Sequence, residues 1–111
     1  SFESFQNQTP SKFSLECLED CELFVLERPT LTALFSKDTF LKEQMLTLIT
    51  QHFTDYIDYF LSRLKNTPEK RYQELKTKRP DILARVPNYY IASYLGITPV
   101  SLSRIQKRVG D

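Results

Sequence analysis

The sequence contains very little glycine, cysteine and histidine, and no tryptophan. Its two glycines, Gly96 and Gly110, cannot form a glycine-rich phosphate-binding loop, and so few glycines favour a mainly helical chain. Two cysteines, Cys17 and Cys21, cannot cross-link a disulfide-rich fold, and a single histidine adds too few ligands for a zinc site. No apolar run approaches the ~18 residues that span a bilayer. We therefore expect no metal site and no membrane segment.

Groups that could support catalysis are equally scarce. The one histidine, His52, lies within a helical pattern, where a packing or surface position is its simplest role. Cys17 and Cys21 have no neighbouring base, and we expect them to be small core residues in a reducing compartment. Asp55 and Asp58 are three residues apart on the same helical pattern and are expected to form a solvated stripe. We expect no catalytic residue and no enzyme activity.

The charge of the chain is unevenly distributed along its 111 residues. Residues 1–66 hold six Lys and Arg against ten Asp and Glu, whereas residues 67–111 hold nine against four. The net charge of +1 conceals this asymmetry. A basic second half suggests that this end meets a polyanion, although a solvated helical surface would have the same composition.

Strands are predicted only near the start of the chain. Alternating apolar residues over 13–17, and an apolar run over 23–26 beyond a polar turn, predict two short strands, which need further strands to be stable. A short helix is predicted over residues 29–35. From Asp38, a candidate N-cap, apolar spacings of three and four predict a long helix to about Lys65.

The apolar stripe of the predicted long helix is too wide for one contact. We expect it to pack against its own domain and against a second copy of itself in a homodimer. Burial of the helix in a larger monomer is the alternative. The residues expected at the dimer interface are Leu41, Met45, Leu48, Ile49, Phe53, Tyr56 and Phe60.

Residues 67–111 predict a series of shorter helices that ends in a helix-turn-helix. Thr67 with Pro68, and Thr98 with Pro99, are helix-start signatures. Between residues 88 and 107, a small residue at 92 suits the contact of two steeply crossed helices, and a glycine at 96 accepts positive φ in the turn. This register is typical of DNA-binding proteins, the alternative being an αα-hairpin that binds no DNA. The inward positions are Ile91, Ala92, Leu95, Ile97, Leu102 and Ile105.

The last predicted helix has an outward face suited to a DNA major groove. Arginine binds a guanine edge with two hydrogen bonds, lysine reaches guanine or phosphate, and valine contacts a thymine methyl. Thr98 and Ser101, at the N-terminal turn, are placed to contact phosphate. The expected DNA-binding residues of this helix are Thr98, Pro99, Val100, Ser101, Ser103, Arg104 and Lys107.

The run RVPNYYIASYLGITPVSLSRIQK, with the preceding EKRYQEL and the segment FESFQNQTPSKFSLECLEDCELFVL, resembles bacterial Crp–Fnr type transcription regulators. More narrowly, it resembles the subgroup with a short C-terminus. The resemblance implies a mainly α chain with a small β remnant. Residues 1–36 would be the end of a cyclic-nucleotide-binding-like β-roll and a short helix, residues 37–66 a long dimerisation helix, and residues 67–111 a helix-turn-helix domain.

The resemblance also implies partners and a compartment. We expect a cytoplasmic homodimer that binds a pseudo-palindromic site in double-stranded promoter DNA, with RNA polymerase and an unknown small-molecule effector as further partners. The chain would be a fragment of such a regulator, whose earlier β-roll strands precede Ser1. Asn88 and Tyr89 resemble the family's phosphate contacts.

Three departures from the family pattern affect these expectations. In the cyclic-AMP receptor proteins an Arg-Ser pair contributes to nucleotide binding, but Ser11 and Lys12 stand there, so we expect no cofactor and weak or no cyclic-AMP binding. The recognition helix opens with Pro99 and Val100 in place of Arg-Glu but keeps Arg104, so the DNA sequence read should differ. The resemblance to the subgroup with a short C-terminus implies that no β-wing follows the recognition helix. These changes favour, as an alternative, a dimeric sensing or interaction module whose helix-turn-helix no longer reads DNA.

Overall fold

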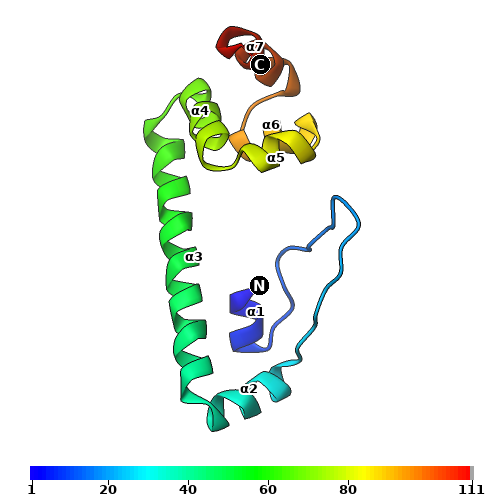
Figure 1. Cartoon of the computed structure of the whole chain (residues 1–111), viewed down its shortest axis with the longest axis vertical. Coiled ribbons are helices and arrows are strands. Elements are labelled where there is room, and N and C mark those ends of the chain that lie inside the picture. The colour runs from blue at the N-terminus through cyan, green and yellow to red at the C-terminus, as the bar shows by residue number, and fades with distance from the viewer. Residues whose placement is uncertain (111) are drawn as a thin grey trace. The chain divides into compact units, whose positions relative to one another are not determined.

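The computed structural model describes residues 1–110 and confirms that the chain is mainly α (Figure 1). The described residues divide into two compact units. The N-terminal unit comprises Ser1–Thr50, and the C-terminal unit begins at Gln51, within the longest helix. The helices are α1 (Phe2–Asn7), α2 (Arg28–Lys37), α3 (Thr39–Lys65), α4 (Pro68–Lys78), α5 (Pro80–Arg85), α6 (Asn88–Leu95) and α7 (Pro99–Val109).

The two segments predicted as strands lie between α1 and α2. Figure 1 shows the chain leaving α1, reversing direction and returning to α2 without regular structure. No β-strand forms anywhere in residues 1–110. Apolar side chains of this stretch stay in solvent, and Phe24 is 95% exposed. The prediction of paired strands is therefore not met within this chain, because a strand is stable only beside hydrogen-bonded neighbours.

The long helix α3 begins and ends where its sequence predicts. The backbone N–H of Leu41 donates to Oδ1 of Asp38 at 3.0 Å, so Asp38 is the N-terminal cap. Arg63 and Lys65 occupy the last turn, where positive charge is favourable at the negative end of the helix dipole. The predicted boundary near residue 66 coincides with the turn between α3 and α4.

The N-terminal unit is loosely packed. Among its described residues no large apolar side chain is fully buried. An open apolar groove lies between its helices instead. Within the same unit, the Arg28 guanidinium lies 5.9 Å from the centre of the Phe5 ring. Apolar residues that line the groove include Phe2, Phe5, Leu31, Phe35, Met45 and Ile49.

The C-terminal unit holds the buried core of the described chain. Helices α4, α6 and α7 each contribute two or three buried side chains, and four half-buried apolar residues (Leu83, Val86, Ile97 and Val109) surround them. Five of the seven buried residues are inward positions of the predicted helix-turn-helix, including the small residue at position 92. The buried set is Tyr72, Leu75, Ile91, Ala92, Leu95, Leu102 and Ile105.

Candidate nucleic-acid interface

The turn between α6 and α7 has the geometry that a helix-turn-helix requires. Gly96 has φ +69°, in the left-handed region that glycine adopts without steric cost. Its N–H donates to the carbonyl of Ser93, and the N–H of Ile97 donates to the carbonyl of Ala92, each at 3.0 Å. This pair of bonds is a Schellman motif, which ends α6 and turns the chain into α7.

The first turn of α7 is closed by a side-chain cap. The backbone N–H of Ser101 donates to the Thr98 hydroxyl oxygen at 3.2 Å, and that hydroxyl donates to the Ser101 hydroxyl at 3.0 Å. Pro99 occupies the first helical position, where its missing N–H costs nothing. Both residues predicted as phosphate contacts, Thr98 and Ser101, therefore also fix the start of the helix.

The two faces of α7 differ sharply in exposure. Leu102 is 0% exposed and Ile105 is 3% exposed, both within the core. The opposite face is in solvent, and Arg104 and Lys107 on it form no ion pair or hydrogen bond within residues 1–110. Every predicted base-reading or groove-facing position is thus accessible. The exposed residues of that face are Val100, Ser103, Arg104 and Lys107.

The start of α6 lies beside this helix. Asn88 and Tyr89 are exposed, and no side chain caps the helix at Pro87. The Gln106 amide of α7 donates to Oδ1 of Asn88 at 3.3 Å, so the two helices are joined at this point. The Tyr89 ring packs edge-to-face on Tyr90. Sequence spacing alone gives no indication of the contact between Gln106 and Asn88.

Three side chains that the sequence analysis does not single out hold the end of α6. The Tyr59 hydroxyl and Nη1 of Arg63, both on α3, each donate to the Tyr94 carbonyl at 3.0 Å. Arg71 of α4 donates from Nη2 to the Leu95 carbonyl at 2.9 Å. These carbonyls have no partner inside their own helix, so cationic donors both satisfy them and complement the helix dipole.

Aromatic packing strengthens the contact between α3 and α6. The rings of Tyr59 and Tyr94 lie 4.9 Å apart, and Arg63 donates to the Tyr59 hydroxyl at 2.8 Å. The pKa of Tyr94 is raised above its usual range. Partial burial is the main cause, and the neighbouring Tyr59 hydroxyl is the second. The Arg63 guanidinium also occupies the space that a side chain on Gly96 would need. The positive φ therefore favours glycine at position 96, and a side chain there would also displace the Arg63 guanidinium.

The turn from α3 to α4 is held by polar side chains. The Ser62 hydroxyl and the Asn66 amide donate to the two carboxylate oxygens of Glu74, at 2.6 and 2.7 Å. Arg71 Nη1 donates to the Asn66 carbonyl at 2.7 Å. Thr67 caps α4 as predicted, because its hydroxyl accepts from the Lys70 N–H. The end of α3 is thereby fixed to α4.

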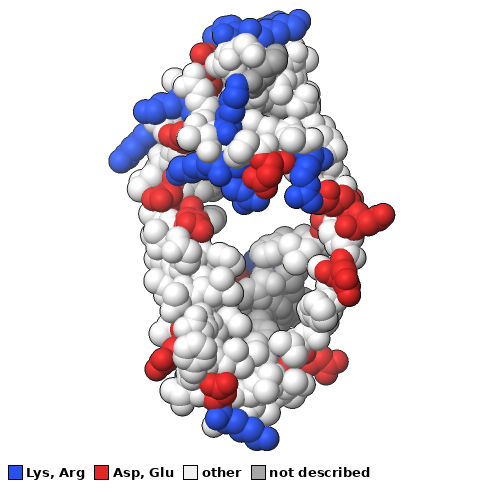
Figure 2. Space-filling view, viewed as in Figure 1, with Lys and Arg blue, Asp and Glu red and all other residues white. Residues whose placement is uncertain are grey.

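Basic side chains gather over the C-terminal unit, as Figure 2 shows. Two of them are neutralised locally. Arg108 pairs with Glu69 at 3.1 Å, and Arg79 donates two hydrogen bonds to Asp81, at 2.8 and 3.0 Å. The Arg79 hydrogen bonds lower the pKa of the exposed Asp81 carboxyl. Arg104 and Lys107 remain as exposed positive charges on the outer face of α7.

The dimer-interface residues predicted on α3 fall into two groups. Leu48, Phe53, Tyr56 and Phe60 are exposed, with Phe53 at 64%. The other three, Leu41, Met45 and Ile49, are half-buried within the N-terminal unit. The stripe thus has one part engaged within its own chain and another part in contact with solvent.

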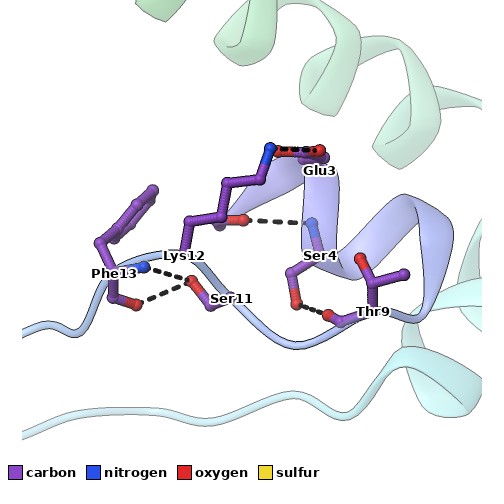
Figure 3. A network of polar contacts seen from close by, with 7 residues as sticks. Glu3, Ser4, Thr9, Ser11, Lys12 and Phe13 are labelled. Carbon is purple, nitrogen blue, oxygen red and sulfur yellow. Dashed lines mark hydrogen bonds and ion pairs between the residues drawn. The ribbon is translucent and has the colours of Figure 1, made fainter.

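Ser11 and Lys12, the residues at the nucleotide-cradle positions, are engaged with their neighbours. The Ser11 hydroxyl donates to the Phe13 carbonyl at 2.7 Å, and Lys12 pairs with Glu3 of α1 at 3.0 Å (Figure 3). Nearby in the same view, the Ser4 hydroxyl donates to the Thr9 carbonyl (Figure 3). The positive charge of Lys12 is therefore balanced by a carboxylate.

The expectation that Cys17 and Cys21 are core residues is wrong. Both thiols are free and exposed, because their stretch of chain has no partner element to bury it. His52, Asp55 and Asp58 are also exposed, as a surface stripe predicts.

Neither a membrane span nor a metal centre is seen in the described part of the chain. None of its helices is both long and apolar enough to cross a bilayer. Residues 1–110 contain no cluster of three or more potential metal-ligating His, Cys, Asp or Glu side chains. Comparisons of the chain with protein-family models, with curated proteins and with solved structures found no match.

Proposed function

We propose that the chain belongs to a DNA-binding transcription regulator that resembles the Crp–Fnr family and binds a pseudo-palindromic promoter site as a homodimer. The observation that carries the proposal is the division of α7 into two faces. Leu102 and Ile105 are buried in the core, whereas Arg104 and Lys107 are exposed and unpaired within residues 1–110. Such a helix can enter a major groove while the core of the unit stays closed.

In this proposal each exposed group of α7 has a distinct role. Arg104 binds a guanine edge through two hydrogen bonds, and Val100 contacts a thymine methyl. Lys107 and Ser101 contact phosphates, which adds affinity for every DNA sequence alike. Asn88 and the free N–H groups at the start of α6 hold a further phosphate.

The family resemblance supplies the remaining parts of the proposal. The stretch between α1 and α2 would be the end of a β-roll, whose other strands would pair with residues 13–17 and 23–26. RNA polymerase and a small-molecule effector would be partners. Cyclic AMP would bind weakly or not at all, because the Lys12 charge is balanced by Glu3 and no Arg-Ser pair is present.

Arg104→Ala is expected to relax the preference for one guanine in each half-site. A bidentate arginine–guanine contact contributes roughly 1–3 kcal/mol of discrimination, so the preference there should fall at least about fivefold. Binding-site selection from random duplexes, with the wild type and the variant in parallel, measures this.

Two matched variants separate base reading from phosphate contact. Arg108→Ala removes the same charge from the same helix, but from a side chain that pairs with Glu69. Ser101→Ala removes a phosphate contact. Both should lower affinity while keeping the selected sequence. If Arg104→Ala selects the wild-type sequence with undiminished stringency, Arg104 does not read bases and the proposed docking of α7 is wrong.

The exposed apolar part of α3 supports the homodimer. Phe53, Tyr56 and Phe60 present aromatic surface to solvent on one helix. Fully burying such a side chain contributes roughly 1.5–3 kcal/mol. A two-fold partner would bury the same residues from both copies, so a few side chains supply most of the association energy.

Phe53→Glu is expected to weaken self-association at least about a hundredfold. The substitution removes apolar burial twice in a symmetric dimer, and each 1.4 kcal/mol corresponds to a factor of ten. Sedimentation equilibrium of the wild type, Phe53→Glu and Thr54→Glu provides the measurement. Thr54 is the neighbouring exposed residue, about 100° round the helix from Phe53, away from the apolar stripe. A wild type that stays monomeric at micromolar concentration, or equal effects of the two variants, would contradict the interface.

One observation favours the alternative, a dimeric sensing or interaction module that does not read DNA. The opening of α7 offers few free donors, because Pro99 has no N–H and the Thr98 and Ser101 hydroxyls bond each other. A salt-dependent mobility shift with mixed genomic duplexes separates the two functions. Binding that weakens steeply with salt supports DNA recognition, whereas no binding at low salt supports the module.

A further inference from the structure

A cavity of about 330 Å³ lies in the C-terminal unit, between the second half of α3, α4 and the end of α6. This volume is at the lower end of the range for small-molecule sites, roughly 300–1,000 Å³. All of its lining residues belong to these three helices or to the turn after α4, and none belongs to α7. The cavity is therefore separate from the surface that is proposed to bind DNA.

Opposite charges line the cavity from two different helices. Asp55 and Asp58 line it from α3, and Lys78 lines it from α4. The side chains of Asp58 and Lys78 are exposed, and neither forms an ion pair or a hydrogen bond within residues 1–110. Asp55 accepts a hydrogen bond from the Gln51 amide at 2.9 Å, which leaves its negative charge unbalanced. The cavity thus holds carboxylates and an ammonium group that do not neutralise each other.

Two further charged side chains of the cavity are already engaged. The carboxylate oxygens of Glu74 accept from Ser62 and Asn66, and Arg79 donates two hydrogen bonds to Asp81. These groups are not free to bind a ligand. The available charges are therefore the two carboxylates of α3 and the ammonium group of α4.

Arg71, also in the cavity wall, shows that the α4 side lacks an acceptor. Its two Nη atoms donate to the carbonyls of Asn66 and Leu95, at 2.7 and 2.9 Å. Its Nε is buried and has no acceptor within residues 1–110. Buried donors are normally hydrogen-bonded. The α4 side therefore favours a ligand group that accepts hydrogen bonds, such as a carboxylate.

Apolar surface is also available in the cavity. The rings of Tyr59 and Tyr94, 4.9 Å apart, line it, as do the buried Leu75 and Leu95. A short carbon chain placed against these groups would release water from apolar surface. The lining thus suits a ligand with two charged ends and an apolar middle.

We propose that this cavity binds a small aliphatic zwitterion, whose ammonium group lies at Asp55 and Asp58 and whose carboxylate lies at Lys78. A ligand with a single charge matches only one side and is repelled by the like charge of the other. Binding does not depend on the proposed DNA recognition, because no residue proposed to contact DNA lines the cavity.

The test titrates the full chain, labelled with nitrogen-15, with ε-aminocaproate while its amide chemical shifts are followed by NMR. Hexylamine and caproate are the matched probes, since each keeps the carbon chain and only one of the two charges. ε-Aminocaproate should shift the amide signals of the cavity residues in a saturable way. Both single-charge probes should bind about three- to tenfold more weakly, because each loses one ion pair and gains a repulsion.

Variants that remove charge identify the two ends of the site. Asp55→Asn with Asp58→Asn should weaken the binding of ε-aminocaproate and hexylamine but not of caproate. Lys78→Gln should weaken the binding of ε-aminocaproate and caproate but not of hexylamine. Lys70→Gln is the matched control, because it removes the same charge from α4 at a residue outside the cavity.

The pattern across probes and variants decides the proposal. No saturable shift with ε-aminocaproate, equal affinity for all three probes, or shifts centred outside the cavity would overturn it. So would a Lys70→Gln variant that weakens binding as much as Lys78→Gln does. None of these measurements involves DNA, so a failure here leaves the proposed function intact.

Discussion

Leu102→Ala is expected to lower the free energy of unfolding of the C-terminal unit by about 2–5 kcal/mol. Leu102 is 0% exposed and lies on α7 among the buried side chains of α4 and α6. Truncation removes its transfer free energy and leaves a cavity that close packing only partly refills. Urea unfolding followed by far-ultraviolet circular dichroism gives the change in free energy.

Val100→Ala is the matched control for this prediction. It removes two methyl groups from the same helix, but from the exposed face, so stability should change by less than about 0.5 kcal/mol. If both substitutions destabilise equally, α7 does not use the face of Leu102 for packing. The assignment of its other face to DNA would then fail as well.

Gly96→Ala is expected to destabilise the same unit by about 1.5–3.5 kcal/mol, the sum of a backbone part and a contact part. The left-handed conformation costs a residue with a Cβ roughly 1–2 kcal/mol. The new Cβ also meets the Arg63 guanidinium, which must move away from Tyr59 and the Tyr94 carbonyl. A lost hydrogen bond of this kind contributes roughly 0.5–1.5 kcal/mol.

A double-mutant cycle with Arg63→Ala separates the two causes. In the Arg63→Ala background the collision is gone, so Gly96→Ala should cost only the backbone part, about 1–2 kcal/mol. The free energies come from the same urea measurement. Strict additivity of the two substitutions would show that Arg63 does not occupy the space beside Gly96.

Helix starts could be predicted because their signals are local. Asp38, Thr67 and Thr98 each accept a hydrogen bond from a backbone N–H three residues later, and a sequence shows that spacing directly. The turn at Gly96 could be predicted for the same reason. Its positive φ disfavours residues with a Cβ, so a glycine at this point of the sequence indicates the turn directly. The inward positions of α6 and α7 follow from helical periodicity.

The contacts that fix the end of α6 could not be predicted from the sequence. Arg63 reaches a carbonyl 31 residues away and Arg71 reaches one 24 residues away, and no periodicity links such positions. The exposure of Cys17 and Cys21 was also missed. Alternation indicates that a strand is compatible with the sequence, but burial depends on neighbours that spacing does not reveal.

The way in which the buried core is assembled also bears on how the C-terminal unit folds. Its core side chains come from α4, α6 and α7, which follow each other closely along the chain between Tyr72 and Ile105. Every loop that must close is short, so little chain entropy is lost before the first apolar contacts form. Helical domains with such local topology fold in microseconds to milliseconds. The same topology provides no unpaired strand edge through which a partly folded copy of this unit could join another.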